Sequence, residues 1–349
     1  PRELTPEEAS KGLTLDSPAV RNRLGHQAIR GALKAKPAPF FAKRLASMIE
    51  IGNFEDDWGR IADADWVIEV VKEDLDIKRK VLAEAAKHRK PGSIVSTNTS
   101  GLSIDAMARD LDDDCRHHFL GTHFFNPPRY MRLVEIVTGA STAEVVLQKM
   151  VGFIGETLGK GIVYAKDTPN FIANRVGVYG MMLALRLTDE MKLTVEQVDA
   201  LTGPGMGRPK SATYRTADLV GLDTLALVAG TAYDKCTNDE ARDLFKVPAL
   251  LDKLLERKSL GQKTGAGFYK KEGKEILALD FRSMDYRPSR KARMDGIGVA
   301  RRYTDICKKI HALVYNPDSA GRFAWELTIG TLCYAANRVG EVADDIVNV

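Results

Sequence analysis

The chain has 349 residues, a length that corresponds to about two domains of ordinary size. Hydrophobic residues make up 44% and charged residues 28%, a balance typical of a globular protein rather than a disordered or fibrous one. The net charge of +4 argues against binding of nucleic acid through bulk electrostatics, and no stretch approaches the ~20 consecutive apolar residues of a membrane helix. The four cysteines show no CxxC spacing, which indicates reduced thiols and a cytoplasmic location.

The two ends of the chain show no natural start or stop. It begins Pro1-Arg2-Glu3-Leu4 without a methionine and stops at Val347-Asn348-Val349, so we expect a piece of a longer protein. The first strong element is a helix, because Ser17-Pro18 combines a capping residue with proline at the first helical position. Apolar residues then recur at helical spacing as far as Leu33.

From residue 65 the sequence alternates between strands and helices. The elements predicted in turn lie at 66–71, 75–88, 93–96, 103–111 and 118–125. Such a strand–helix–strand series predicts a parallel sheet with right-handed crossovers. The next apolar segment, 132–137, follows too closely for a crossover helix, so it should return antiparallel as a hairpin at the sheet edge. A helix and a strand at 161–165 complete this part.

Beyond Thr168 the pattern becomes helical, with one short strand predicted at Phe268-Tyr269. We therefore predict an α/β sheet domain over residues 1–165 and a helical domain over 166–281. The Arg- and Lys-rich stretch 282–294 resembles a linker, and 282–349 as a whole is predicted to hold this linker and the start of a second helical repeat. The repeat rests on Asp318 to Phe323, which resembles Asp167 to Phe171 at an offset of 152 residues.

A parallel sheet with a helical partner domain suggests a dinucleotide enzyme, so a glycine-rich phosphate turn is expected. Two stretches contain closely spaced glycines, Gly203 to Gly207 and Gly296 to Gly298. Neither follows a predicted strand, and a phosphate turn needs a strand before it and a helix after it. Both are therefore interpreted as ordinary turns, and the chain contains no GxGxxG of the required kind.

His123 is the histidine most indicative of chemistry, because it lies near the C-terminal end of a predicted parallel strand, where ligands of such sheets bind. A hairpin centred on the turn at residue 129 places it opposite Glu135. A histidine held by a carboxylate is oriented, kept in one tautomer and able to stabilise its own imidazolium. From these residues alone, an ordinary hydrogen-bonded pair explains the pattern as well as a catalytic one. The histidines suggest no metal site.

Four ordered motifs carry a family resemblance. They are Asn98 to Leu102, Gly121 to Pro128 with Leu133 to Ile136, Lys166 to Arg175, and Lys263 to Tyr269. Together they resemble the 3-hydroxyacyl-CoA dehydrogenase family over roughly residues 60 to 272. The segment after 272 resembles that of long multifunctional bacterial members, in which a second helical repeat precedes a hydratase domain.

The resemblance implies roles for residues at the matching positions. His123 would be the catalytic base, Glu135 its carboxylate partner, and Ser100 and Asn174 would complete the catalytic set. Ser100, Asn126 and Asn174 would hold the substrate by hydrogen bonds. The implied contacts to the cofactor NAD are Glu73, Lys78, Asn98, Ser100, Asn126 and Lys263. An alternative remains for some of them: Lys78 as a solvated helix charge, and Asn98 and Ser100 as turn or cap residues.

The chain departs from the family pattern at its N-terminus. Members open with a strand, a GxGxxG turn, a helix and a second strand ending in an acid, and Pro1 falls just after that acid. The fold class expected is therefore α/β: an incomplete Rossmann-type, mostly parallel sheet with an antiparallel edge hairpin, followed by an all-α C-terminal domain. Loss of the pyrophosphate cradle at a helix N-terminus predicts impaired NAD binding by this chain.

Our first hypothesis is therefore an NAD-dependent dehydrogenase that oxidises 3-hydroxyacyl-CoA to 3-oxoacyl-CoA in fatty-acid β-oxidation, as a cytoplasmic homodimer that binds no nucleic acid and spans no membrane. A second hypothesis is a catalytically silent acyl-CoA-binding or dimerisation module with the same fold. A third is a dehydrogenase for a hydroxy acid without CoA. Saturation by a CoA thioester but not by the free acid would separate the first from the third.

Overall fold

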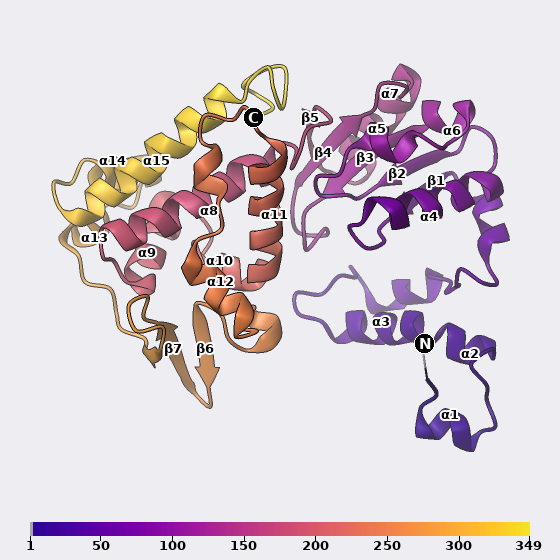
Figure 1. The fold of residues 1–349 in the computed structure, drawn as a ribbon, viewed down its shortest axis with the longest axis horizontal. Helices are drawn as coiled ribbons and strands as arrows, with labels where there is room; N and C mark the ends of the chain where they lie inside the picture. The colour runs from indigo at the N-terminus through magenta and orange to yellow at the C-terminus, as the bar shows by residue number, and fades with distance from the viewer. Residues whose placement is uncertain (1–2) are drawn as a thin grey trace. The chain divides into compact units, whose positions relative to one another are not determined.

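The computed structural model describes residues 3–349, which divide into two compact units (Figure 1). The first unit ends at Asp167 and the second runs from Thr168 to Val349. Each unit is described by itself below. No helix among the described residues is both long and apolar enough to cross a membrane.

The first unit is built on a five-stranded sheet with the order β1-β2-β3-β4-β5. Its strands are β1 (Trp66–Glu69), β2 (Ile94–Thr97), β3 (Phe119–Phe124), β4 (Leu133–Thr138) and β5 (Gly161–Ala165). All neighbours pair in parallel except β3 and β4, which confirms the mostly parallel sheet. The antiparallel strand is not at the edge as expected, because β5 returns through a helical crossover and pairs in parallel on the outer side of β4.

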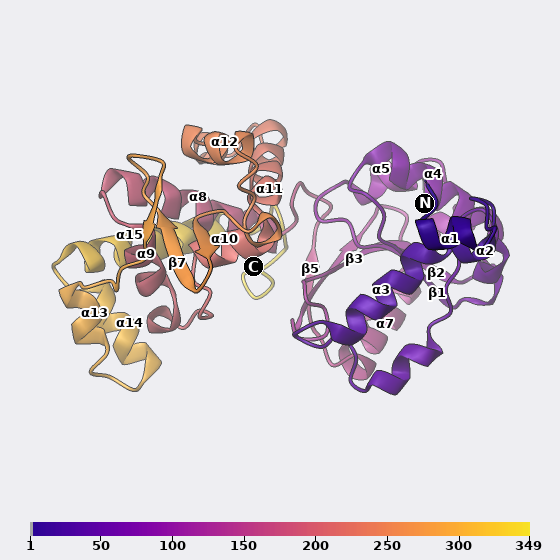
Figure 2. The ribbon, with the colours of Figure 1, turned by 90° about the horizontal axis from the view of Figure 1, so that it is seen from below.

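Helices cover both faces of this sheet. Leu120, Val134 and Ile136 point to one face and pack against α7 (Glu144–Gly152) and the short π-helix η3 (Phe153–Thr157). Gly121 points to the opposite face, where a Cβ would lie 2.8 Å from Ile104 Cδ1 of α5 (Ile104–Ala108). Glycine therefore allows α5 to pack closely on β3. Figure 2 shows α5 and α7 on opposite sides of the strands.

The remaining helices of the first unit include α3 (Arg23–Lys34) and α4 (Leu75–His88), which match predicted segments, and several short ones that were not predicted. The shorter elements are α1 (Pro6–Ser10), α2 (Pro18–Arg21), α6 (Asp113–His117) and the 3-10 turns η1 (Lys43–Met48) and η2 (Trp58–Asp63). The helix predicted from Ser17 is interrupted at Asn22, and α6 was not predicted. Asp112 caps α6, since its side chain accepts a hydrogen bond from the Cys115 N–H.

The second unit is mainly helical. Its helices are α8 (Ala173–Glu190), α9 (Val195–Thr202), α10 (Tyr214–Val220), α11 (Leu222–Lys235), α12 (Ala249–Glu256), α13 (Asp295–Ala300), α14 (Ile306–Val314) and α15 (Ser319–Asn337). Short 3-10 turns lie at η4 (Pro204–Met206), η5 (Arg242–Phe245) and η6 (Gln262–Thr264).

The second unit also contains a small antiparallel sheet where one short strand was expected. Its strands are β6 (Tyr269–Glu272), β7 (Glu275–Leu279) and β8 (Tyr286–Pro288). Gly273, with a φ of +59°, begins the two-residue turn between β6 and β7, a conformation that glycine adopts without strain. The second unit is therefore not purely α-helical, and the stretch 282–294 expected as a linker supplies β8.

The two longest helices of the second unit, α8 and α15, lie side by side in Figure 1. Tyr179 of α8 stacks on Tyr334 of α15 with ring centroids 3.9 Å apart. Leu183, further along α8, approaches Gly330, which precedes Tyr334 on α15. The two helices therefore run in opposite directions. They are the segments that the sequence suggested to be repeats, and the repeat itself stays a prediction.

Candidate active site

The hairpin of β3 and β4 brings His123 and Glu135 together as predicted. The two residues are direct partners in the antiparallel register, and His123 Nδ1 lies 2.6 Å from Glu135 Oε2. The exposed fraction is 5% for His123 and 0% for Glu135. The ring of Phe125 lies against the imidazole at a centroid distance of 4.6 Å. The predicted hydrogen-bonded pair is therefore present and largely shielded from water.

This geometry determines how the imidazole can take part in proton transfer. A carboxylate that accepts a hydrogen bond at Nδ1 holds the proton on that nitrogen, so the basic lone pair of the neutral ring belongs to Nε2. When Nε2 takes up a proton, the buried Glu135 carboxylate stabilises the resulting imidazolium. The pair is thus suited to general acid–base chemistry on a hydroxyl or carbonyl group.

Polar side chains gather on one face of the sheet, near the carboxyl ends of β1, β2 and β3. Side chains alternate along a strand, so His123 shares the face of Gly121, which is the face covered by α5. Thr97 pairs in register with Gly121, and Glu69 pairs with Thr97. Glu69, Thr97, His123 and Glu135 therefore lie on the same face. The carboxyl ends of parallel strands are where ligands of open α/β sheets bind.

Lys78 of α4 is fully engaged on this face. It is 1% exposed, and its Nζ lies 3.0 Å from both carboxylate oxygens of Glu69, 3.3 Å from the carbonyl oxygen of Val71 and 3.3 Å from Glu73 Oε2. Thr97 donates a further hydrogen bond to Glu69 at 2.6 Å. The alternative of a solvated helix charge is therefore wrong for Lys78.

Glu73 connects this buried ion pair to Ser100. The Oε1 atom of Glu73 accepts hydrogen bonds from the Thr99 hydroxyl at 2.6 Å and from the Ser100 N–H at 2.8 Å. The Glu73 side chain remains 32% exposed. Lys78 therefore holds a partly exposed carboxylate, and that carboxylate fixes the backbone of Ser100.

The two asparagines implied for this unit are placed differently. Asn98 Oδ1 accepts a hydrogen bond from the Phe124 N–H at 2.9 Å, which ties the end of β2 to the end of β3 directly after His123. Asn126 is exposed in the turn that follows β3. Asn98 thus has a structural task in addition to any contact with a ligand.

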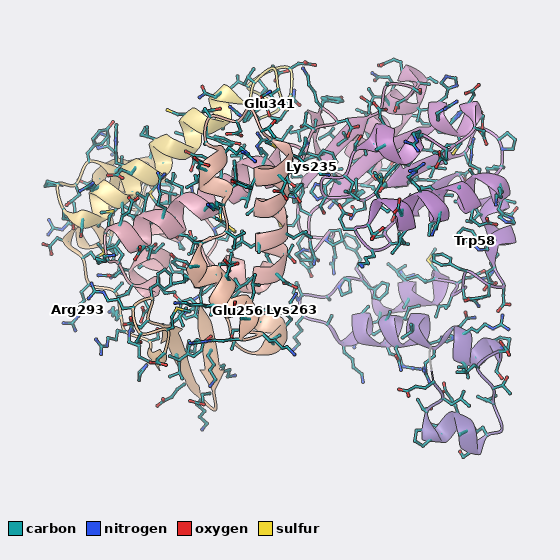
Figure 3. The ribbon with its side chains drawn as sticks, in the orientation of Figure 1. Trp58, Lys235, Glu256, Lys263, Arg293 and Glu341 are labelled. Atoms are coloured by element: carbon teal, nitrogen blue, oxygen red, sulfur yellow. The ribbon has the colours of Figure 1, made fainter. Side chains whose placement is uncertain are left out.

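The other two implied residues, Asn174 and Lys263, belong to the second unit. Asn174 is half-buried in the first turn of α8. Lys263 lies in the turn after α12 (Figure 3). Its Nζ is 2.6 Å from both carboxylate oxygens of Asp223. The side chains of Lys263 and Asp223 are 49% and 45% exposed. Lys263 therefore remains accessible to an anionic ligand.

Several residues of this arrangement were not anticipated from the sequence. Glu69 is the acid at the end of an otherwise apolar strand, which is the signal that could have revealed it. Thr97 and Thr99 flank the recognised Asn98. Asp167 accepts hydrogen bonds from the Ser103 hydroxyl and from the N–H groups of Ile104 and Asp105, and so fixes the start of α5.

Comparisons with known proteins agree with this geometry. Residues 13–168 match the family described as "3-hydroxyacyl-CoA dehydrogenase, NAD binding domain", and residues 171–271 match the C-terminal domain of the same family. A probable 3-hydroxyacyl-CoA dehydrogenase of Deinococcus radiodurans is 41% identical over 251 residues, which cover 72% of each chain. The chain belongs to the 3-hydroxyacyl-CoA dehydrogenase family. This is a family of oxidoreductases.

Two further similarities define how the chain relates to other members of the 3-hydroxyacyl-CoA dehydrogenase family. A probable 3-hydroxyacyl-CoA dehydrogenase of Bacillus subtilis is 48% identical over 346 residues, which are 99% of this chain but 44% of that protein. The chain thus spans less than half the length of this relative. The crystal structure of Mycobacterium tuberculosis FadB2 superposes with a TM-score of 0.60 at 31% identity, over 73% of this chain and 86% of that one.

The NAD-binding domain of the family raises the question of which residues here suit the cofactor. Glu73 is a partly exposed carboxylate next to Ser100, close to the carboxyl ends of β1 and β2, and such groups suit the hydroxyls of a ribose. Within residues 3–349, no glycine-rich turn joins a strand directly to a helix in the manner of a pyrophosphate cradle. Glu73 and Ser100 are therefore residues of the described sheet unit that suit a ribose hydroxyl.

Proposed function

We propose that this chain carries the catalytic centre of an NAD-dependent 3-hydroxyacyl-CoA dehydrogenase, which oxidises a 3-hydroxyacyl-CoA to the 3-oxoacyl-CoA. The observation that supports this most directly is the buried His123–Glu135 pair on the polar face of the sheet. A general base with an oriented imidazole is what removal of a hydroxyl proton requires. Membership of the 3-hydroxyacyl-CoA dehydrogenase family supports the same reaction.

In this mechanism His123 Nε2 takes the proton from the 3-hydroxyl group while the C3 hydride leaves. Glu135 stabilises the positive charge that develops on the imidazole, and in the reverse direction the imidazolium returns the proton to the carbonyl oxygen. Ser100 and Asn126 would donate or accept hydrogen bonds at the reacting oxygen and so orient C3, and the family resemblance implies the same role for Asn174. One such donor is worth ~3 kcal/mol in well-studied sites.

NAD, when bound, supplies the hydride acceptor for this reaction. Glu73, Asn98 and Ser100 would hold its nicotinamide riboside, because they lie at the carboxyl ends of β1 and β2. Lys78 would act by fixing Glu73, since its own ammonium is buried against Glu69. Lys263 and Asn126 would contact the cofactor from their accessible positions.

We place the reaction in fatty-acid β-oxidation, since a 3-hydroxyacyl-CoA arises by hydration of an enoyl-CoA and a 3-oxoacyl-CoA is suited to thiolytic cleavage. A homodimer in the cytoplasm is part of this proposal. Sedimentation velocity of the protein that contains this sequence tests the dimer.

The direct test of this function is reduction of acetoacetyl-CoA, followed as the loss of NADH. The protein that contains this sequence should turn over the thioester with saturation and leave free acetoacetate unchanged, whereas the chain of residues 1–349 alone is expected to bind NADH poorly. His123→Ala should abolish turnover while acetoacetyl-CoA binding, measured by calorimetry, is retained, because the base acts mainly in the transition state. The matched control is His88→Ala, which removes a half-exposed histidine that contacts Glu84 on α4 and should keep full activity.

Two outcomes would overturn the proposal. Turnover of free acetoacetate without saturation by the thioester would indicate a dehydrogenase for a hydroxy acid that lacks CoA. Thioester binding by the unmodified protein without any turnover would indicate a silent acyl-CoA-binding module.

A further inference from the structure

The backbone directly before Asn174 is held in an unfavourable conformation. Asn170 and Phe171, which precede α8, have φ angles of +66° and +49°. Residues other than glycine seldom adopt this left-handed region, and each such residue costs on the order of 1 kcal/mol or more. Asparagine tolerates this region because its short polar side chain can hydrogen-bond to the nearby backbone, whereas the side chain of phenylalanine has no hydrogen-bonding group. The surrounding structure must therefore stabilise this turn.

The first anchor holds Asn170, four residues before Asn174 in the sequence, to helix α11. Asn170 is 2% exposed, and its side-chain amide donates a hydrogen bond of 2.8 Å to the carbonyl oxygen of Val228. Phe171 is completely buried beside it, and its N–H bonds the carbonyl oxygen of Thr168 at 3.1 Å. These contacts determine the position of the chain as it enters α8.

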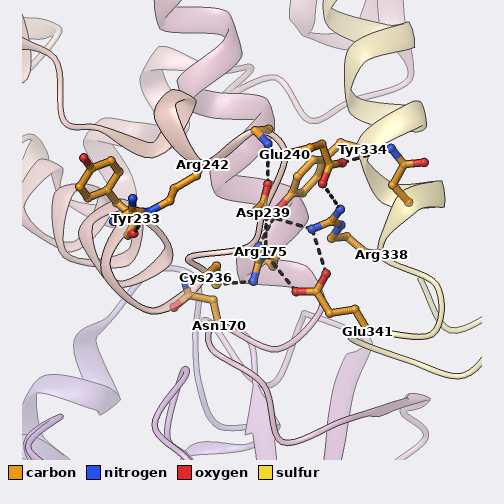
Figure 4. A network of polar contacts seen from close by, with 12 residues as sticks. Asn170, Arg175, Tyr233, Cys236, Asp239, Glu240, Arg242, Tyr334, Arg338 and Glu341 are labelled. Carbon is orange, nitrogen blue, oxygen red and sulfur yellow. Dashed lines mark hydrogen bonds and ion pairs between the residues drawn. The ribbon is translucent and has the colours of Figure 1, made fainter.

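A second anchor lies directly after Asn174. Arg175 is completely buried, and its guanidinium contacts Asp239, the Tyr334 hydroxyl at 2.6 Å, Glu341 at 3.1 Å and the sulfur of Cys236 (Figure 4). Tyr334 belongs to α15 and Glu341 follows that helix. The residue after Asn174 is thus held by side chains that come from much later in the sequence.

The second anchor is a closed network rather than a single ion pair. The Tyr334 hydroxyl donates to Asp239 Oδ2 at 2.7 Å, and Arg338 reaches the same oxygen at 3.0 Å. The Tyr334 ring also stacks on Tyr179, which lies one turn beyond Arg175 on α8. Tyr334 therefore determines both the guanidinium position and the packing of the first two turns of α8.

From these contacts we infer that Tyr334 is a positioning residue for Asn174, so that α15 is part of the machinery of the proposed reaction. Tyr334 acts through Arg175, which fixes the first turn of α8 against the strain in the preceding turn. This inference rests on the proposed function only where it predicts that a change at Tyr334 alters turnover. The structural link from Tyr334 to the first turn of α8 can be tested without activity.

The test is a double-mutant cycle between Tyr334 and Asn174. Tyr334→Phe keeps the ring that stacks on Tyr179 but removes the hydroxyl that contacts Arg175 and Asp239. We expect it to lower kcat for acetoacetyl-CoA reduction about tenfold, measured well below the unfolding temperature of each variant. In an Asn174→Ala background the same change should alter kcat less than about twofold, because residues that act as one unit are not additive.

Hydrogen exchange measured by mass spectrometry supplies the readout that needs no turnover. Peptides covering residues 170–178 should exchange faster in Tyr334→Phe than in the unmodified protein. The matched control is Tyr315→Phe, which changes an exposed tyrosine of the same C-terminal segment and should alter neither exchange there nor kcat.

Two results would overturn the inference. One is an equal loss of kcat from Tyr334→Phe with and without Asn174, which would indicate a general effect on folding. The other is unchanged exchange over residues 170–178. If the unmodified protein shows no turnover at all, the proposed function fails, and the exchange measurement still decides whether Tyr334 positions the first turn of α8.

Discussion

Two buried polar clusters, one in each unit, differ in how far apart in the sequence their members lie. In the first unit Lys78 is nine residues from Glu69, and His123 is twelve from Glu135. In the second unit Arg175 reaches Asp239 across 64 residues and Glu341 across 166. The first cluster is assembled by strand register and one hairpin, whereas the second requires the whole helical unit to be folded.

The difference indicates different tasks for the two clusters. The first lies at the carboxyl ends of strands and includes a carboxylate, Glu73, that is 32% exposed, so it is suited to contact a ligand. The second has two completely buried members, Arg175 and Asp239, and it joins α8 to α15. We therefore expect only the first cluster to contact a ligand directly, whereas the second affects the reaction through the stability and position of α8.

The largest effect on stability should come from Arg175. Replacing it with methionine leaves the Asp239 carboxylate buried with one cation fewer, and breaking a buried ion pair in this way costs about 3–5 kcal/mol of unfolding free energy. Hydrogen bonds from Tyr334 and Arg175 hold the pKa of Asp239 below its usual range although burial opposes ionisation, so loss of Arg175 should also raise that pKa. Urea denaturation monitored by circular dichroism measures the loss.

The control for Arg175→Met is the double variant Arg175→Met/Asp239→Asn, which removes both charges. It should be more stable than Arg175→Met alone, because the buried carboxylate that Arg338 alone would have to balance is then removed. If the single variant loses less than about 1 kcal/mol, the network is not what holds α8 to α15. Glu135→Gln serves as the contrast from the first unit, since it removes a charge but can keep the hydrogen bond to His123, and should lower activity with little loss of stability.

The next largest loss of stability should come from a change at Lys78, in the polar cluster of the first unit. Lys78→Met leaves Glu69 buried but still hydrogen-bonded by Thr97, so we expect a loss toward the lower end of the range, about 3 kcal/mol. Glu73 would also lose its cation. The KM for NADH should therefore rise, a change not expected of Arg175→Met. Lys80→Met, an exposed neighbour on α4, is the matched control and should leave both quantities unchanged.

Glu135→Gln should have a smaller effect than His123→Ala on the same reaction. The amide oxygen can still accept the hydrogen bond from Nδ1, so the imidazole keeps its orientation, but the neutral amide no longer stabilises the imidazolium. We expect kcat to fall about 10- to 100-fold, a barrier increase of about 1.4–2.7 kcal/mol, with KM nearly unchanged. Steady-state kinetics test this, and unchanged kcat would show that Glu135 only orients the ring.

The comparison also explains what could be predicted from the sequence. The His123–Glu135 contact follows from period-two alternation and one turn centre, so it was predictable from local pattern. The parallel pairing of β1, β2 and β3 was predictable from the alternation of strands with helices. The extra strand pairing of β5 was not, because the choice of which sheet edge a strand joins depends on the packing of α7 and not on the strand's own residues.

The Arg175 network could not be predicted from the sequence. Its partners Cys236, Asp239, Tyr334 and Glu341 have no shared spacing or periodicity. Lys78 shows the same limit on a smaller scale: the sequence places it on a helix, but only the packing of α4 on β1 decides that it is buried. Local sequence thus determined the candidate pair, and tertiary packing determined what surrounds it.

The smallest expected effect is a pH dependence that belongs to the second unit. Asp199 and Asp218 are buried there, and burial raises the pKa of each to about 6 even though backbone N–H groups of Tyr214 and Phe268 donate to them. Between about pH 5 and about pH 7 the folded state therefore binds more protons than the unfolded state, whose carboxylates are already ionised. Stability should fall as pH rises through this window, by about 1 kcal/mol for each carboxylate.

Thermal or urea unfolding across this pH range measures the effect. Asp218→Asn should remove about half of the dependence of the unfolding free energy on pH, whatever it does to absolute stability, because the amide does not titrate. The matched control is Asp223→Asn on the same unit, where the ion pair with Lys263 holds the pKa of a half-exposed carboxylate below its usual range and already ionised throughout the window. That variant should keep the full slope. A stability that rises with pH in the unmodified protein would show that the backbone N–H groups outweigh burial at both aspartates, and would place them with Asp239 as carboxylates that stabilise the unit in their charged form.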